Sequence, residues 1–269
     1  GFAMVAPVWE RFVTDFTTAS DGIPLAFERV GEGPPLVLLH GFGSSRHQNW
    51  KSTGWYGALN EAGYCVLAMD CRGHGESGKP HDVSAYGHDR MSEDVIQVMD
   101  AAGIQSAPVV GYSMGGFLAL RLAAHHPGRA TRLALCGVGE YYLRGQRIAD
   151  EASRSALAKA LMTPDKSHLT GRARMFREFA DQPGKDRLAL AACMRAMSQG
   201  LTPDVLATIA APVLVVCGEQ DDIAGVPGPL AAAFPNGMAV TIPGRDHMSA
   251  VGERKTRQVV TDFLRASAG

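Results

Sequence analysis

The stretch Ala107-Pro108-Val109-Val110-Gly111-Tyr112-Ser113-Met114-Gly115 gives the strongest indication of how this chain folds. Its first half is apolar and β-branched, which predicts a buried strand, and the apolar run from residue 116 to residue 122 predicts a helix. Ser113 stands at the apex of the turn between them, with glycine two residues before it and two residues after it. Side chains at Gly111 and Gly115 would collide in so sharp a turn. The pattern predicts a serine hydroxyl held at the end of a strand, beside the first free amides of a helix.

Strand-like and helix-like segments alternate on both sides of this turn. Pro35 to His40 and Tyr64 to Met69 are short, wholly apolar runs, as expected for strands inside a parallel sheet. Ser92 precedes a helical pattern that runs to about Ala102, and we expect it to cap that helix. The other expected elements are a hairpin of Arg11 to Thr18 with Ile23 to Val30, a helix Trp55 to Ala62, strands Arg132 to Cys136, Val213 to Cys217 and Ala239 to Ile242, a helix ending at Phe234, and a helix from about Glu253. This alternation predicts an α/β fold with a mostly parallel, doubly wound sheet and right-handed crossovers.

The alternation stops between residues 139 and 206, where only helical patterns occur. Apolar residues recur at helical spacing in Arg147 to Leu161, Gly171 to Phe179 and Asp186 to Ala196. We predict that residues 139–206 form a helical cap inserted into a core domain of residues 4–138 and 207–269. Ligands of open α/β sheets bind at the carboxyl ends of the strands, so such a cap would cover the site. Its many arginines indicate either a solvated helical face or a preference for acidic substrates. They include Arg144, Arg147, Arg154, Arg172, Arg174 and Arg177.

Length and composition are those of an ordinary globular chain. The 269 residues are 46% hydrophobic and 20% charged, which suits one α/β domain with an insertion. A net charge of -1 gives no reason to expect nucleic acid or an anionic membrane as a partner. No apolar run is long enough to cross a membrane, and the start lacks a basic, apolar leader, so we expect Met4 to be the native start. Five cysteines without a C-x-x-C pair indicate a reducing, cytoplasmic compartment.

A serine hydroxyl is a poor nucleophile at neutral pH and needs an adjacent base. His247 is the candidate, because it follows the last expected strand in a loop that a parallel sheet places at the same edge as Ser113. The base needs a carboxylate to hold its tautomer, and Asp221, after the preceding strand, is our first choice. Asp222 and Glu140 are the alternatives, since each also follows a strand. With Asp221, the order along the chain is serine, aspartate, histidine.

Attack of such a serine on a carbonyl also needs donors for the oxyanion that develops. The glycines of His40-Gly41-Phe42-Gly43 allow backbone amides to turn inward. We expect the N–H groups of Phe42 and Met114 to form this oxyanion hole, and the His40 side chain to brace the loop.

Two other patterns are weaker candidates for a site. His125 and His126 end the helix expected after Ser113, and adjacent residues do not share a helix face, so they are a poor metal pair. We expect them to complement the C-terminal end of the helix dipole. The run Gly73-His74-Gly75-Glu76-Ser77-Gly78 matches G-x-G-x-x-G, but Lys79-Pro80 follows where a dinucleotide site needs a helix. We therefore expect neither a metal nor an organic cofactor.

Together these motifs resemble those of the α/β-hydrolase superfamily over nearly the whole chain. His40 to Gly43 resembles its oxyanion loop, Gly111 to Gly115 resembles its nucleophile elbow, and Ala211 to Asp221 resembles its acid strand. Asp70-Cys71-Arg72-Gly73-His74-Gly75-Glu76-Ser77 resembles its D-x-R-G-H-G-x-S signature. Gly244-Arg245-Asp246-His247 departs from the common G-x-G-H form of the histidine loop.

The resemblance implies a serine hydrolase with a small helical cap, similar to esterases and cofactor-free haloperoxidases. Dehalogenases and epoxide hydrolases of this fold use an aspartate nucleophile, whereas Ser113 implies an acyl-enzyme. We therefore expect hydrolysis of small or medium carboxylic esters by Ser113, Asp221 and His247. C–C bond hydrolysis of diketones, perhydrolysis and a ligand receptor on this fold stay open as alternatives. The sequence leaves the acyl and alcohol specificity and the oligomeric state undetermined.

Overall fold

The computed structural model describes residues 13–144, 151–198 and 200–266. Within them, eight strands form one sheet in the order β1-β2-β4-β3-β5-β6-β7-β8. β1 pairs antiparallel with β2, and β2 pairs antiparallel with β4, whereas the other neighbours are parallel. The predicted α/β class with a mostly parallel, doubly wound sheet is confirmed. The strands are β1 (Asp15–Thr18), β2 (Pro24–Val30), β3 (Pro35–Leu39), β4 (Cys65–Met69), β5 (Ala107–Tyr112), β6 (Ala130–Cys136), β7 (Val213–Gly218) and β8 (Gly237–Ile242).

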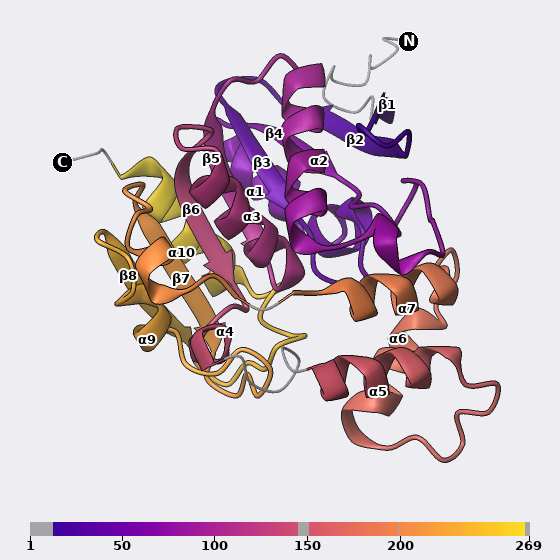
Figure 1. Ribbon diagram of the computed structural model, residues 1–269. Coiled ribbons are helices and arrows are strands. Elements are labelled where there is room, and N and C mark those ends of the chain that lie inside the picture. Colours follow the sequence, from indigo (N-terminus) through magenta and orange to yellow (C-terminus); the bar gives the residue numbers. More distant parts are fainter. Residues whose placement is uncertain (1–12, 145–150, 199, 267–269) are drawn as a thin grey trace, which may run out of the picture.

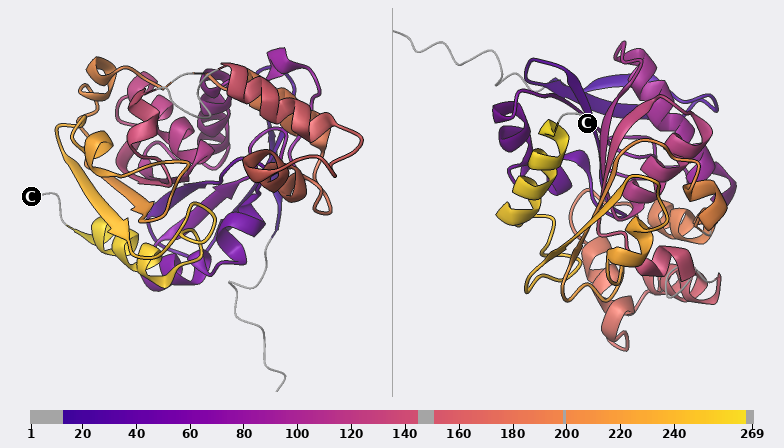
Figure 2. Two further views of the ribbon diagram at one scale, coloured as in Figure 1. Left: turned by 90° about the horizontal axis from the view of Figure 1, so that it is seen from below. Right: turned by 90° about the vertical axis from the view of Figure 1, so that its left-hand side faces the viewer.

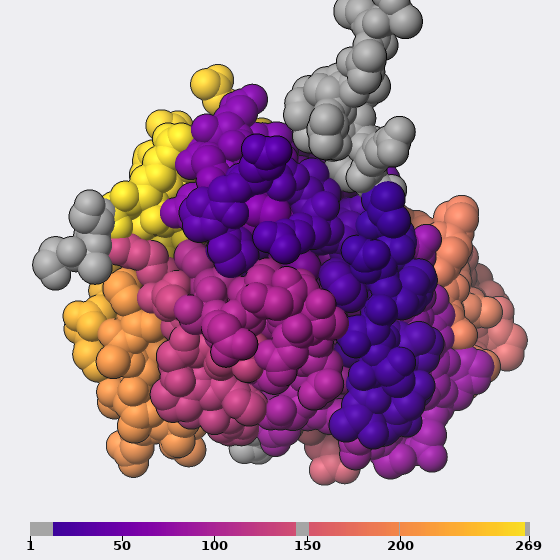
Figure 3. Space-filling view, turned by 90° about the horizontal axis from the view of Figure 1, so that it is seen from above, coloured from indigo at the N-terminus to yellow at the C-terminus, as the bar shows by residue number. Residues whose placement is uncertain are grey.

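Helices cover both faces of this sheet (Figure 1). One face carries α2 (His88–Ala101), α3 (Met114–His125) and the short α9 (Gly228–Ala231). The other face carries α1 (Trp55–Glu61) and α10 (Arg254–Arg265). Figure 3, seen from the top of Figure 1, shows yellow residues of the C-terminal helix beside purple and magenta residues from the first half of the chain.

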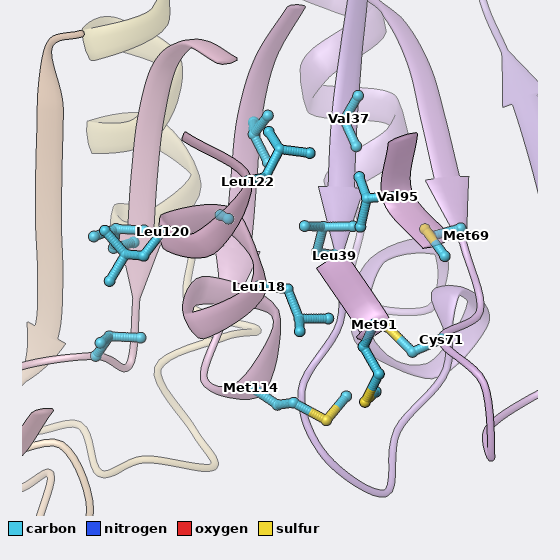
Figure 4. Packing of buried hydrophobic residues seen from close by; sticks show 14 of the residues in the cluster. Val37, Leu39, Met69, Cys71, Met91, Val95, Met114, Leu118, Leu120 and Leu122 are labelled. Atoms are coloured by element: carbon cyan, nitrogen blue, oxygen red, sulfur yellow. The ribbon is translucent and has the colours of Figure 1, made fainter. Parts of the chain in front are cut away.

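The core lies on both faces of the sheet because the strand residues alternate in direction. Val37 and Leu39 of β3 pack toward α2 and α3, where Val95 and Leu118 meet them (Figure 4). Leu38, between them, belongs to the cluster under α1 and α10. All five side chains are at most 1% exposed. A strand buried on both faces must be apolar at every position, which is why the run of residues 35–39 has no polar residue.

The prediction that Ser92 caps α2 is wrong. The helix begins at His88, four residues earlier, and Gly87 with φ 123° precedes it. Ser92 lies inside the helix, fully buried, and its hydroxyl donates a hydrogen bond to the Asp89 carbonyl at 2.8 Å. The burial of His88 and Met91 extends the apolar face of the helix by one turn, so tertiary packing overrides the local capping preference of serine.

Five helices occupy the described residues between β6 and β7. Figure 1 and the left view of Figure 2 show three of them, α5, α6 and α7, grouped beyond the sheet on the side where β6 ends. The expected helix Arg147 to Leu161 falls partly on residues 145–150, which lie outside the described residues. The division of the chain into a core domain and a cap domain stays a prediction. The five helices are α4 (Glu140–Arg144), α5 (Glu151–Met162), α6 (Gly171–Ala180), α7 (Arg187–Ala196) and α8 (Pro203–Leu206).

The strand order places a crevice next to β3. The strand that follows β3 along the chain, β4, lies on one side of it, and β5 lies on the other side. The loops after β3 and β5 therefore separate at the carboxyl edge of the sheet, which is where open α/β sheets bind ligands. Between β3 and α1 the chain forms one wide helical turn, η2 (His47–Lys51), and a 3-10 turn, η3 (Val83–Ala85), precedes α2.

Candidate active site

Ser113 occupies a strained position at the end of β5. Its φ of 52° is the only positive φ of a residue other than glycine in the described part of the chain. The two flanking glycines explain how the turn closes: a Cβ on Gly115 would lie 2.0 Å from the Leu39 carbonyl oxygen, and one on Gly111 would lie 2.4 Å from the Gly115 carbonyl oxygen. Backbone strain of this kind amounts to about 1–3 kcal/mol and persists only where the surrounding structure holds it.

The structure brings Ser113, His247 and Asp221 together, although 108 residues separate the serine from the aspartate. The Ser113 Oγ lies 3.0 Å from His247 Nε2. On the far side of the ring, His247 Nδ1 lies 2.9 Å and 3.0 Å from the two carboxylate oxygens of Asp221. Asp221 and His247 are only 5% and 7% exposed. A buried carboxylate at Nδ1 fixes the proton there, so Nε2 is left as an acceptor for the serine hydroxyl.

The turn after β7 distinguishes Asp221 from the two alternatives. The Asp221 carboxylate also accepts hydrogen bonds from the backbone N–H groups of Ile223 and Ala224 at 3.0 and 2.8 Å, so it is held toward His247. The Asp222 side chain is 70% exposed and pairs with Arg172 at 3.2 Å. Glu140 begins α4, and its side chain packs beside Gly225.

The loop after β3 brings Phe42 to the start of α3, so the two expected oxyanion donors lie in the same place. Phe42 and Met114 line one cavity together with Ser113. Met114 is the first residue of α3, where backbone N–H groups have no partner within the helix. Cys71 N–H donates to His40 Nε2 at 3.0 Å, so His40 Nδ1 carries the proton and donates to the Gly41 carbonyl at 2.8 Å. Burial lowers the pKa of His40 to about 4, and the neutral ring ties this loop to the end of β4.

Two residues that support the site were not predicted from the sequence. Asn49 in η2 accepts a hydrogen bond from the Gly41 N–H at 3.0 Å and so helps to shape the oxyanion loop. Tyr112 donates a hydrogen bond from its hydroxyl to the His247 carbonyl at 2.6 Å. A lone asparagine gives no local signal, and Tyr112, although it precedes the serine, has the sequence pattern of an ordinary apolar strand residue.

Ser113 and His247 line a cavity of about 310 Å³. Aromatic and sulfur-containing side chains form much of its wall, and part of the wall comes from α6 and α7. Methionine side chains are flexible and polarizable, so they fit ligands of varied shape. No arginine or lysine lines the cavity within the described residues. The apolar lining includes Phe42, Met114, Phe117, Tyr141, Tyr142, Met175, Phe176, Phe179, Met194, Met197, Met248 and Val251.

The three arginines of α6 are paired with acidic residues outside the cavity. Arg172 pairs with Asp222, Arg174 with Glu178 at 2.8 Å, and Arg177 with Asp181 at 2.9 Å. Of the two interpretations of these arginines, these three pairs favour a helical face stabilised by ion pairs. Arg147 and the side chain of Arg144 lie outside the described residues.

The glycine-rich run after β4 encloses a carboxylate of the protein itself. A Cβ on Gly75 would lie 2.1 Å from the Asp70 carboxylate, which accepts hydrogen bonds from the N–H groups of Glu76 at 2.8 Å and Arg46 at 2.7 Å. These amides are therefore already used, and no helix begins at this run. In the described residues no group of three or more His, Cys, Asp or Glu side chains is arranged to hold a metal ion, and His126 instead lies 2.6 Å from Glu93.

Comparison with known proteins agrees with this fold. A family profile described as alpha/beta hydrolase fold matches residues 34–192, which is more than half of the chain. The chain belongs to this α/β-hydrolase family. A hydrolase from Pseudomonas aeruginosa PA01 has the same fold, with a TM-score of 0.77, 28% identity and coverage of 94% of this chain and 98% of that chain.

Two curated relatives with higher identity match less than half of this chain. A 2-hydroxymuconate semialdehyde hydrolase of Pseudomonas putida is 41% identical over 107 residues, which are 40% of this chain and 37% of that protein. The bifunctional epoxide hydrolase 2 of Rattus norvegicus is 33% identical over 120 residues, which are 44% of this chain. That match spans only 21% of the length of the rat protein.

No helix in the described residues has both the length and the apolar character needed to cross a membrane.

Proposed function

We propose that this protein is a serine hydrolase that cleaves small or medium carboxylic esters through an acyl-enzyme intermediate. The observation that carries the proposal is the continuous series of contacts from Ser113 Oγ through His247 to the Asp221 carboxylate, at the wall of an apolar cavity. A serine activated by a histidine attacks carbonyl carbon, and an aspartate nucleophile, which epoxide opening in this fold uses, is not the residue at position 113.

In the proposed mechanism, Ser113 Oγ attacks the ester carbonyl while His247 Nε2 takes its proton. Asp221 holds the other ring proton and stabilises the imidazolium that forms. The N–H groups of Phe42 and Met114 donate to the oxyanion of the tetrahedral intermediate. His247 then returns the proton to the departing alcohol, and a water molecule activated by His247 releases the acid. Because a hydroxyl, an imidazole and a carboxylate complete this cycle, the proposal involves no metal or organic cofactor.

The lining of the cavity supports a neutral, partly apolar small molecule as the substrate. Binding of an anionic substrate would leave its charge without a cationic side chain among the described residues that line the cavity. A volume of about 310 Å³ is at the small end of the range for ligand sites, which favours short or medium esters. We further propose a reducing, cytoplasmic compartment, because all five cysteines are free thiols and are buried.

One observation favours a second candidate function. The relative with 41% identity is named for 2-hydroxymuconate semialdehyde, a carbonyl compound that contains no ester. With a diketone in the cavity, the same serine would attack a ketone carbon, and a C–C bond in place of a C–O bond would break. This alternative differs from ester hydrolysis only in the leaving group, so substrates distinguish the two.

The test is hydrolysis of p-nitrophenyl esters from acetate to long acyl chains, with Ser113→Ala in parallel and Ser84→Ala as a matched exposed control. We expect saturable turnover that is greatest with a short or medium chain and falls by at least about a thousandfold in Ser113→Ala. Ser84→Ala should keep the wild-type rate. Ester turnover that survives in Ser113→Ala would overturn the mechanism, and turnover of vinylogous diketones without any ester turnover would favour the second candidate.

A further inference from the structure

The cavity that contains Ser113 has a polar cluster at a second place on its wall. Ser198, His88 and Tyr142 line the cavity there. The ring of Phe117 packs against two of them, with its centroid 5.4 Å from the His88 ring and 5.0 Å from the Tyr142 ring. Phe117 is four residues after Ser113 on α3, so the cluster lies about one helical turn, roughly 6 Å, along this helix from the nucleophile.

The Ser198 and His88 pair has one proton more than its own hydrogen bond uses. Burial lowers the pKa of His88 to about 3, so its ring is neutral and carries one N–H. Ser198 Oγ lies 3.1 Å from His88 Nδ1 and accepts a hydrogen bond from Arg121 Nη2 at 2.7 Å. The hydroxyl and the ring hold two protons, and their contact takes up one. The His88 ring is also hydrogen bonded to the Ser198 backbone, and its Nε2 has no partner in the described residues, so the ring proton lies on Nδ1. The Ser198 hydroxyl proton is then left to be donated to a ligand.

Tyr142 adds a second donor beside this pair. Its hydroxyl oxygen accepts a hydrogen bond from the Leu201 N–H at 2.9 Å, which leaves the phenolic proton to be donated. Burial raises the pKa of Tyr142, so the hydroxyl keeps that proton at neutral pH. A Cβ on Gly200 would lie 3.0 Å from the Tyr142 ring, so Gly200 packs directly against this tyrosine.

The cluster is rich in donors but carries little net charge. Arg121 lies behind Ser198, and its Nε pairs with the Asp89 carboxylate at 2.8 Å. The guanidinium is therefore compensated on the side away from the cavity, while it polarises the Ser198 hydroxyl. Donors without a net positive charge favour a carbonyl or hydroxyl oxygen as the ligand. They would not offset the larger free-energy cost of removing a carboxylate from water.

We propose that Ser198 and Tyr142, oriented by His88 and Arg121, form a subsite that binds a second, uncharged oxygen function of the substrate. This inference rests on the proposed ester hydrolysis and specifies its substrate class. The substrates would be esters that carry a keto or hydroxyl group about four or five bonds from the scissile carbonyl. This separation matches the length of one turn of α3. Phe117 lies between the two ends and packs against the apolar chain that joins them.

The experiment measures kcat/KM for matched ester pairs. One pair places the oxygen in the acyl part, p-nitrophenyl 5-oxohexanoate against p-nitrophenyl hexanoate, and a second places it in the alcohol part, 3-oxobutyl acetate against butyl acetate. We expect the oxo ester to be preferred by about tenfold in one of the two pairs, which corresponds to one or two hydrogen bonds to a neutral group. The ratio should fall several-fold in Ser198→Ala and in Tyr142→Phe, each of which removes one hydroxyl.

Ser84→Ala and Tyr64→Phe are the matched controls, because they remove the same groups away from the cavity and should keep the wild-type ratio. Equal rates for oxo and plain esters in both pairs would overturn the subsite, as would a preference that survives in both Ser198→Ala and Tyr142→Phe. A preference for the half-ester of glutaric acid over 5-oxohexanoate would overturn the inference of an uncharged group. Failure to hydrolyse any ester, in contrast, would overturn the proposed function itself. If Tyr142→Phe does not fold, Ser198→Ala alone decides the outcome.

Discussion

Tyr112 and His247 are joined by a hydrogen bond of 2.6 Å from the tyrosine hydroxyl to the histidine backbone carbonyl. Tyr112 directly precedes Ser113, and His247 lies in the loop after β8, three strands away in the sheet. The residue before the nucleophile therefore fixes the loop that holds the proposed base. The tyrosine is 5% exposed, so its hydroxyl has no competing contact with bulk water.

We expect Tyr112→Phe to lower kcat for ester hydrolysis by about tenfold and the free energy of unfolding by about 1–3 kcal/mol, because the His247 carbonyl is left without its buried donor. Kinetics and urea denaturation measure the two effects. Tyr64→Phe is the matched control, since the Tyr64 hydroxyl also donates to a carbonyl, that of Leu264 at 2.8 Å, but away from the cavity. If Tyr112→Phe kept wild-type kcat, the hydrogen bond would have no role in positioning His247.

We expect Asp221→Asn to reduce kcat by about a thousandfold to ten-thousandfold, because an amide does not hold the Nδ1 proton and stabilise the imidazolium. Asp222→Asn removes the same charge from the neighbouring residue and should change kcat less than twofold. The matched pair of esterase assays checks the choice between the two carboxylates. The reverse pattern of losses would assign the third catalytic role to Asp222.

We expect Gly115→Ala to prevent folding or to destabilise the protein severely, since its Cβ would lie 2.0 Å from the backbone oxygen of Leu39. Gly57→Ala is the opposite case. Gly57 lies inside α1, and a Cβ added there would have no atom within 4 Å, so alanine should raise the free energy of unfolding by about 0.5–1 kcal/mol. Urea denaturation of the two variants measures both changes. A normally stable Gly115→Ala protein would contradict the close approach of α3 to β3.

Stability should decrease as the pH falls from 7 to 5. Burial lowers the pKa of His40 to about 4 and of His74 and His88 to about 3. The unfolded chain binds these protons with a pKa near 6.5, so it is favoured over the folded chain as the pH falls through about 6.5 toward 4. Each histidine contributes at most about 1.4 kcal/mol per pH unit in this window.

Urea midpoints at pH 7.5 and pH 5.0, at constant ionic strength, measure this effect. Hydrogen bonds from Arg72 and Arg46 are the chief cause of the lowered pKa values of the Asp21 and Glu76 carboxyl groups. Their contribution to stability is lost mainly below their ordinary pKa values of 3.8 and 4.5, outside the interval from pH 7.5 to pH 5.0. His74→Gln should flatten the pH dependence of the urea midpoint, because glutamine does not titrate. Glutamine is chosen because its amide can still donate to the Arg72 carbonyl, which His74 Nδ1 contacts at 2.9 Å. Equal midpoints at the two pH values would contradict the neutral state of the three buried rings.

The fold class and two members of the candidate site, Ser113 and His247, could be predicted from the order of residues along the chain. Gly111 is required by a contact within the turn itself, since its Cβ would lie 2.4 Å from the Gly115 carbonyl oxygen, whereas Gly115 is required by the approach of α3 to Leu39 of β3. The position of His247 followed from a general rule, since loops after parallel strands meet at one edge of the sheet. Local rules failed at Ser92, where the burial of His88 and Met91 extends α2 by a turn.

The choice between Asp221 and Asp222 required the three-dimensional structure, because adjacent carboxylates in one turn have the same sequence signal but point in different directions. Asp221 turns inward to two backbone amides and His247, whereas Asp222 turns outward to Arg172. The cavity and its Ser198 and Tyr142 donors likewise depend on how the helices between β6 and β7 pack against the rest of the chain. A strand or a turn is specified by neighbours along the chain, but a side chain's partners in a packed interior come from residues far apart in sequence, and only the complete fold places them.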